Sequence, residues 1–302
     1  MKMRKPFIGV GTWICAAVVA FITSSGDAAT GADSGVGVVA EYRPAARRFT
    51  FTRQPGAEVV PVQIGSVVMT GDRVTLPAGG SVIVQLANGE TASFKGPGTF
   101  TVPAAPPLGK VASILQSMSA LLDDDYRIAG TAASRGGEKC EQTDQDVSPI
   151  DVPILVPGAR VIAGQRDLPL AWRGGCPPFV VRVLSGKDSL IHRESIEGWQ
   201  VRLDDVPMSV GQYSIVITDA AGRRFTADLN AVETGPQLPA DLVTDKSSLG
   251  VIAQAAWLAG QDGGRWRLES FELLRPLIRA GDPLAGAVGD GVLWGPAPAP
   301  AR

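Results

Sequence analysis

A run of short alternating segments at residues 59–102 constrains the fold more than any other feature of this sequence. Apolar and polar residues alternate with a period of two, and glycine, proline or asparagine separates the short runs. This pattern is typical of half-buried β-strands that are joined by tight turns. The stretch therefore predicts a small all-β module.

One hairpin in this run can be placed in register from its apolar residues. A three-residue loop at 87–89 puts Val84 opposite Ala92 and Val82 opposite Phe94, so that the apolar side chains share one face. A two-residue loop would place them on opposite faces, because a slip of one residue flips every side chain. We therefore expect the longer loop, with its glycine in the left-handed conformation and a bulge after it. Val82, Val84 and Phe94 are then predicted core residues.

The same stretch resembles the FecR-like domain of bacterial envelope proteins. The resemblance rests on glycine-based turns at residues 64–66, 70–74, 77–81 and 86–90, which include Gly71, Asp72, Asn88 and Gly89. Asn88 stands where the family usually has Asp. The resemblance implies a small all-β envelope module at residues 36–103, used in sensing or interaction, with no catalytic residues. We expect no cofactor.

The N-terminus predicts a secretory signal peptide at residues 1–28. Three basic residues lie within the first five, an apolar run follows at 8–22, and Gly26 and Ala28 supply small residues for cleavage. The apolar run is shorter than the roughly 20 residues that span a bilayer, so we expect cleavage near Ala28. We expect a periplasmic or secreted protein that touches the membrane only if this segment is not cleaved.

FecR-type regulators carry a cytoplasmic segment that handles a sigma factor ahead of a membrane span. Here only seven residues precede the apolar run, so we expect no sigma-factor role. Charged residues make up 19% of the chain and the formal net charge is −2. Because no basic stripe stands out, we expect no nucleic-acid partner.

Residues 104–150 are predicted to be a linker with one helix. Apolar residues within 110–126 recur at the helical spacing and form one stripe, which we expect to cover an open sheet. Polar, glycine-containing sequence follows and includes Cys140.

Residues 151–233 form a second predicted all-β segment. The candidate strands are 160–163, 168–172, 179–184, 189–193, 199–203, 212–218 and 224–230. Seven short strands at this spacing favour a sandwich, and the segment around Trp172 resembles the strand of immunoglobulin-like modules that buries a Trp. The Cys-Trp-Cys spacing of antibody domains is missing, so the resemblance is one of architecture. Trp172 is the predicted centre of this core.

The C-terminal part predicts helices. Apolar periodicity marks two helices within residues 240–294, which we expect to form a helical hairpin packed on the sandwich. Residues 295–302 are rich in Pro and Ala and predict a disordered tail. The expected fold class is mainly β with a C-terminal helical hairpin, in which a FecR-like module precedes an immunoglobulin-like sandwich.

Cys140 and Cys176 are the two cysteines that remain after removal of the signal. An even count in an oxidising compartment favours a disulfide between them. The loop-entropy relation gives about 4 kcal/mol for a bridge of this span.

Candidate chemistry is sparse. The single histidine, His192, lies near serines in sequence but belongs to no recognisable triad, and one His with two Cys cannot make an ordinary zinc site. Acidic runs at Asp204-Asp205 and at 123–125 are the material for a hydrolase that uses paired carboxylates. Several tryptophans could line a glycan-binding surface, although core packing explains most of them.

The leading hypothesis is a non-catalytic binding or sensing module of the bacterial envelope, whose partner is an envelope protein or a glycan. The first alternative is a structural scaffold of an envelope assembly. The second is the carboxylate-pair hydrolase.

Overall fold

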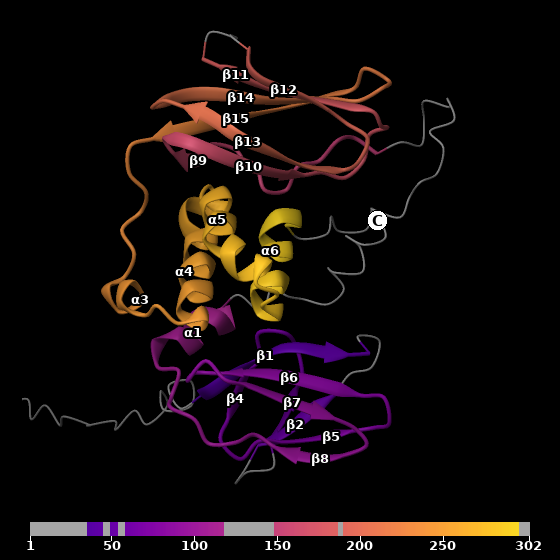
Figure 1. The fold of residues 1–302 in the computed structure, drawn as a ribbon, viewed down its shortest axis with the longest axis vertical. Coiled ribbons are helices and arrows are strands. Elements are labelled where there is room, and N and C mark those ends of the chain that lie inside the picture. Colours follow the sequence, from indigo (N-terminus) through magenta and orange to yellow (C-terminus); the bar gives the residue numbers. More distant parts are fainter. Residues whose placement is uncertain (1–34, 45–48, 54–57, 118–147, 187–189, 296–302) are drawn as a thin grey trace, which may run out of the picture.

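The computed structural model describes residues 35–44, 49–53, 58–117, 148–186 and 190–295. Figure 1 shows three layers: an N-terminal β module, a group of helices, and a β-sandwich. The helices of residues 240–294 come last in the chain, yet they lie between the two β units that precede them. The protein is therefore mainly β with C-terminal helices. The predicted signal peptide and the tail after Gly295 lie outside the described residues.

The N-terminal module consists of two four-stranded sheets, with strand orders β4-β1-β6-β7 and β3-β2-β5-β8. Its strands are β1 (Gly35–Arg43), β2 (Thr50–Arg53), β3 (Glu58–Pro61), β4 (Val67–Met69), β5 (Arg73–Leu76), β6 (Ser81–Leu86), β7 (Thr91–Lys95) and β8 (Gly98–Thr101). Strand β1 is buried along most of its length because it is central in its sheet and is also covered by a helix from the middle layer.

The predicted hairpin register is confirmed. Val84 pairs with Ala92 and Val82 pairs with Phe94, while the N–H of Leu86 donates to the carbonyl of Glu90 at 2.8 Å across the three-residue loop. Gly89 has φ +85, in the left-handed region that the loop requires. Val82 and Val84 are fully buried and Phe94 is half-buried, with its ring 5.6 Å from that of Phe100.

The other predicted turn, at Gly71 and Asp72, surrounds a buried carboxylate. Gly71 has φ +86, and Asp72 is 1% exposed. The carboxylate of Asp72 accepts from the N–H of Met69 at 2.9 Å and pairs with Arg53 on β2 at 3.3 Å. Because a buried carboxylate needs such partners, the turn joins β2 to the β4–β5 connection.

Helix α1 (Lys110–Ser117) follows the module. Its residues Val111, Ala112 and Leu115 are buried, and the helix contacts helix α4 of the middle layer as well as strand β4. The apolar stripe therefore packs on another helix more than on the expected open sheet. The predicted continuation to residue 126, and the rest of the linker to 147, lie outside the described residues.

All seven strands predicted for residues 151–233 are confirmed. They are β9 (Ala159–Ile162), β10 (Gly164–Ala171), β11 (Phe179–Ser185), β12 (Leu190–Ile196), β13 (Gln200–Met208), β14 (Gly211–Thr218) and β15 (Arg224–Val232). A five-stranded sheet with the order β12-β11-β14-β15-β9 faces a two-stranded sheet of β10 and β13. Trp172 is fully buried between them, with its ring 5.1 Å from that of Phe179 in an edge-to-face arrangement.

Two features make this sandwich immunoglobulin-like. Strand β9 runs parallel to β15, whereas every other described pair in the sandwich is antiparallel. The hydroxyl of Tyr213, near the start of β14, donates to the carbonyl of Ser209 at 2.9 Å. A tyrosine that bonds back to the backbone at this corner is a hallmark of such domains.

The C-terminal region corrects the expected hairpin. It contains the short helix α3 (Ala240–Thr244), then α4 (Ser248–Gly260), the 3-10 turn η2 (Gln261–Gly263), α5 (Arg267–Arg279) and α6 (Pro283–Trp294). Helix α6 was not predicted, because its glycines and alanines form no clear apolar stripe and glycine is a poor helix former.

Local capping and close packing explain why α6 forms. The carboxylate of Asp282 accepts from the N–H groups of Leu284 and Ala285, and Pro283 occupies the first helical position. A Cβ at Gly289 would lie 2.6 Å from Cδ1 of Ile278, so glycine allows α6 to approach α5. Tertiary packing outweighs the low intrinsic propensity of the segment.

The helices were expected to pack on the sandwich. They pack on both β units instead. Helix α6 contacts β1 of the N-terminal module and β10 of the sandwich, and α5 contacts β9 and β10. The middle layer therefore connects the two β units (Figure 1).

Candidate functional site

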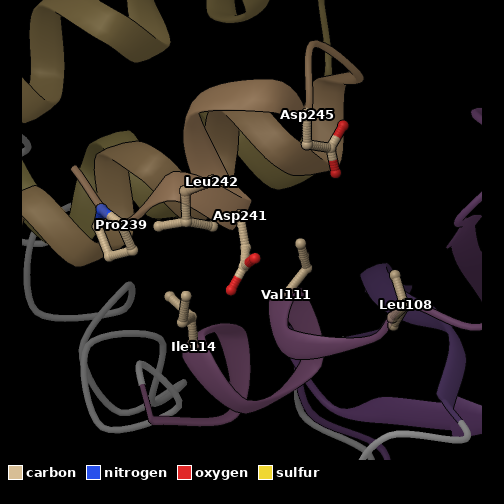
Figure 2. A pocket seen from close by; sticks show the side chains of 7 residues that line it. All are labelled: Leu108, Val111, Ile114, Pro239, Asp241, Leu242 and Asp245. Atoms are coloured by element: carbon tan, nitrogen blue, oxygen red, sulfur yellow. The ribbon is translucent and has the colours of Figure 1, made fainter.

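A surface pocket lies between α1 and α3, at the junction of the N-terminal module and the helical layer (Figure 2). Its volume is about 330 Å³. The lining residues are Leu108, Val111, Ile114, Pro239, Asp241, Leu242 and Asp245. Five of these are apolar and two are carboxylates, so the pocket combines an apolar body with negative charge.

The two sides of the pocket come from distant parts of the chain. Val111 and Ile114 lie one turn apart on α1, so they point to the same side of that helix. The other side begins at Pro239, the N-cap of α3, and ends at Asp245, whose extended backbone terminates this helix of five residues. A ligand in the pocket would contact both segments at once.

The α3 side is fixed by polar contacts. Oδ1 of Asp245 accepts from the N–H and the hydroxyl of Ser247, at 2.9 and 2.7 Å. The amide of Gln254 on α4 donates to the carbonyls of Leu242 and Asp245, at 2.7 and 2.9 Å. A Cβ at Gly250 would lie 2.3 Å from Cγ of Asp245, so glycine is required there. The Asp245 carboxylate is therefore held in place before any ligand binds.

A second polar site joins α5 to the sandwich. This charged cluster consists of Arg166, Asp167, Arg202, Glu269, Glu272 and Arg275. At its centre Asp167 pairs with Arg275 and, at 2.6 Å, with Arg202. The backbone N–H of Asp205 donates to Oδ1 of Asp167 at 3.1 Å.

The environment of Asp167 strongly favours its ionised form. The hydrogen bond from the N–H of Asp205 is the largest influence, and the guanidinium groups of Arg275 and Arg202 add to it, against the opposing effect of burial. Together they lower the pKa of Asp167 to about 2. The cluster is therefore an ionic link between β10, β13 and α5.

Two glutamates complete the charged cluster in different ways. Oε1 of Glu269 accepts from the N–H of Ile162 at 2.7 Å and from Arg166 at 2.6 Å, so this buried carboxylate is well paired. Burial raises the pKa of Glu272, although Arg275 lies 3.1 Å away. Oε1 of Glu272 is buried and has no hydrogen-bond partner. These contacts describe a structural interface rather than an open reaction site.

Of the residues considered for catalysis, His192 belongs to neither site, whereas Asp204 and Asp205 contact members of the charged cluster. His192 is half-buried on β12, and its Nε2 lies 3.6 Å from the carboxylate of Glu194 on the same face. Asp204 is exposed and pairs with Arg202 at 2.8 Å. Asp205 has φ +53 in a bulge opposite Asp167. Its backbone N–H, rather than its carboxylate, forms the hydrogen bond to Asp167. The acidic run at 123–125 lies outside the described residues.

Cys176 lies in a polar corner of the sandwich. It is 5% exposed, its N–H donates to Oδ2 of Asp219 at 3.0 Å, and Nη2 of Arg223 lies 3.2 Å from its Sγ. Burial opposes ionisation of Asp219, but the N–H groups of Cys176 and Arg223 and the Arg223 guanidinium hold its pKa below the ordinary value. Cys140 lies outside the described residues, so the disulfide with Cys176 stays a prediction.

The five tryptophans within the described residues are spread over the sandwich, the start of α5 and helices α4 and α6. Trp172 and Trp266 are buried, and Trp199, Trp257 and Trp294 are half-buried in the sandwich, in α4 and at the end of α6. Within the described ranges no group of three or more His, Cys, Asp or Glu residues is placed to hold a metal ion. Helices of the described part include none long and apolar enough to cross a membrane.

Sequence reasoning did not find the pocket or the charged cluster. Asp241 lies in a short helix whose pattern was too brief to detect, and Asp245 directly follows that helix, whereas Leu108 and Val111 belong to a separate segment. Asp167 carried one weak signal, since it is an acid directly before the apolar strand that leads to Trp172. Neither site has a spacing motif, because each forms only where distant segments meet.

No family model and no curated protein sequence matches this chain. Among solved structures, CopC from Methylosinus trichosporium OB3b shares 14% identity over 30% of this chain and 97% of its own, with a TM-score of 0.23. The fibronectin(III)-like modules of CbhA from Clostridium thermocellum share 8% identity over 64% of this chain and 83% of theirs, with a TM-score of 0.21. Similarities at these TM-scores assign neither a fold nor a function to the chain.

Proposed function

We propose that the protein is a non-catalytic binding or sensing module of the bacterial envelope. In this proposal residues 36–103 are a FecR-like module, and the immunoglobulin-like sandwich follows it. The observation that carries the proposal is the pocket between α1 and α3, because its two sides belong to segments attached to different β units. Binding there couples the two ends of the molecule.

The chemistry of the pocket indicates the class of ligand. Its apolar lining suits a hydrocarbon body, and Asp241 with Asp245 suits a positive charge on the ligand. The ligand we propose is a cationic amphiphile, such as an alkylammonium group or a lysine side chain presented by a partner protein.

Sensing follows from the position of the pocket. Helix α1 leads out of the N-terminal module, and α3 lies between the sandwich and α4 along the chain. A ligand that contacts both helices favours the arrangement in which they are close, since a ligand shifts an equilibrium toward the state that it binds better. A change at one β unit can then be transmitted to the other.

The binding test uses n-octylammonium and n-octanol as matched probes in isothermal titration calorimetry. We expect the cation to bind more tightly than the alcohol, and we expect Asp241→Asn to remove that preference. Ile114→Lys should weaken binding of the cation, because the new lysine repels a ligand of like charge. Val243→Lys is the matched control, because Val243 lies on α3, is 45% exposed and does not line the pocket. Equal affinities for both probes would refute this ligand class.

Hydrogen exchange tests the sensing part separately. Amides of α1 and α3 should exchange more slowly when n-octylammonium is bound, whereas those of β14 should not change. If the cation binds and neither helix gains protection, the pocket binds ligands without coupling its two sides. Size-exclusion analysis of an envelope extract then distinguishes a discrete complex from the large assembly that a scaffold protein would form.

The envelope assignment rests on the N-terminal sequence and on the proposed disulfide between Cys140 and Cys176. Mass spectrometry of the mature protein tests the first, since cleavage predicts a new N-terminus near residue 28. Non-reducing peptide mapping tests the second, since the cross-linked peptide should disappear after reduction. An intact Met1 in the envelope fraction would indicate an anchored protein.

A further inference from the structure

The five-stranded sheet of the sandwich has two edges, and the edge at β9 is closed by helix α5. The N–H of Arg160 donates to the carbonyl of Arg265 at 2.7 Å, just before the helix begins. The N–H of Ile162 donates to the carboxylate of Glu269 at 2.7 Å. These contacts satisfy the backbone donors of β9 that would otherwise be free for another strand.

The opposite edge of the sheet is formed by β12. Within the described part of the chain β12 pairs with β11 and with no other strand. Leu190, at its start, is 54% exposed. A strand with an unpaired row of N–H and C=O groups is a ready template for a further strand.

Two arginines lie beside each other on the outer face at this edge. Arg182 of β11 is directly opposite Arg193 of β12. The neighbouring residues Val181 and Val183 are fully buried in the sandwich core, so both arginines belong to the opposite face of the sheet. Like charges directly opposite each other are destabilising, so this pair is a cost to the isolated protein.

This face offers little to balance the pair. Among the described strand residues that share it, Asp228 on β15 is the single acid, and it lies opposite Ser214 rather than beside the arginines. Nε of Arg182 is buried and has no hydrogen-bond partner. Adjacent guanidinium groups are well suited to carboxylates, which they bind through paired hydrogen bonds.

We propose that the open edge of β12, with Arg182 and Arg193, binds an extended acidic segment of a protein partner by strand addition. An added strand satisfies the free backbone groups of β12, and its residue opposite Arg193 lies on the same face as both guanidinium groups. An acidic side chain at that position then neutralises the pair. The described strand residues of this face include no aromatic side chain on which a sugar could stack. The site is separate from the pocket between α1 and α3.

The test uses a fluorescein-labelled peptide, Thr-Val-Glu-Val-Glu-Val-Thr, with its termini blocked, and measures fluorescence anisotropy near physiological ionic strength. Charges further apart than about 8 Å are largely screened there, so adjacent charges dominate. A second peptide has Lys in place of Glu. Two further analogues are N-methylated at the Glu or at the Val residues, which removes the donors along one peptide edge at a time.

We expect Arg193→Glu to raise the Kd of the acidic peptide at least tenfold, and the Lys peptide to bind at least tenfold more weakly to the wild-type protein. Arg224→Glu is the matched control and should change the Kd less than twofold. Arg224 is an exposed arginine on the same face, but it lies on β15 rather than at the edge. One of the N-methylated analogues should lose binding.

Three results would overturn the proposal. If Arg193→Glu and Arg224→Glu weakened binding of the acidic peptide equally, the peptide would be attracted by the general charge of this face and not by the edge of β12. Unchanged binding of both N-methylated analogues would exclude strand addition. Self-association of Arg193→Glu with unchanged peptide affinity would show that Arg193 serves to keep copies of the edge apart. A circular-dichroism melt of each variant verifies folding, and Arg193→Gln replaces Arg193→Glu if that variant does not fold.

Discussion

The side-chain amide of Gln85 donates a hydrogen bond to Oδ2 of Asp282 at 3.0 Å, which links strand β6 to the N-terminus of α6. The same amide donates to the hydroxyl of Ser248 on α4 at 2.9 Å. One buried glutamine therefore connects the N-terminal module to two helices. Since Oδ1 of Asp282 also caps α6, this aspartate has two separate roles.

Replacement of Asp282 should separate these roles. Asp282→Ala removes the helix cap and the partner of Gln85, and should lower the free energy of unfolding by about 1–3 kcal/mol. Asp282→Ser keeps a capping oxygen and should cost less. Urea denaturation measures both. Equal losses for the two variants would show that the cap contributes little and that the Gln85 contact dominates.

Gly89→Val should destabilise the N-terminal module by about 1–2 kcal/mol or more, because a β-branched residue tolerates positive φ poorly. A Cβ at Gly89 meets no atom within 4 Å, so the cost is conformational rather than steric. Gly198→Val is the control. A Cβ at Gly198 likewise meets no atom within 4 Å, but Gly198 does not have a positive φ. Thermal melts compare the two, and similar midpoints would contradict the assigned role of Gly89.

Trp172→Ala should cost about 3–5 kcal/mol by opening a cavity in the sandwich. Trp172→Phe should cost much less, because the ring of Phe fills part of the space and Nε1 of Trp172 has no hydrogen-bond partner to lose. Denaturant unfolding measures both variants. A similar cost for the two would mean that the contact with Phe179 depends on the full indole ring.

Acid stability should depend on Asp167. The folded-state pKa of Asp167 is about 2, below its ordinary value of 3.8, so the folded state binds this proton more weakly than the unfolded state. Its contribution is therefore fully present above about pH 4 and is lost as the pH falls towards 2. Asp167 lies near the surface, so we expect about 1–2 kcal/mol after screening. Asp167→Asn should flatten this part of the stability profile, as measured by urea unfolding at each pH.

The pH dependence of stability that Glu272 contributes should have the opposite sign to that of Asp167. Burial raises its pKa, so the folded state binds this proton more tightly than the unfolded state. Its contribution to stability therefore grows as the pH falls through the raised pKa towards the ordinary value of 4.5. Glu272→Gln should flatten the profile in the window just above pH 4.5. An unchanged slope in that window, measured by urea unfolding at each pH, would contradict this assignment.

Much of the local architecture could be predicted from the sequence, because strands and turns depend on neighbouring residues. Period-two alternation located the strands of the sandwich, and the shared apolar face of Val84 and Ala92 determined the hairpin register. Turn glycines such as Gly89 carry their own conformational signal.

Only the tertiary structure decided where these elements meet. Helix α6 lacks an apolar stripe and forms because Asp282 caps it and Gly289 lets it approach α5. The pocket requires Val111 and Asp245, and the charged cluster requires Asp167 and Arg275, each pair separated by more than a hundred residues. Such contacts leave no periodicity or spacing in the sequence, because they depend on how packed layers are placed in space rather than on the local chain.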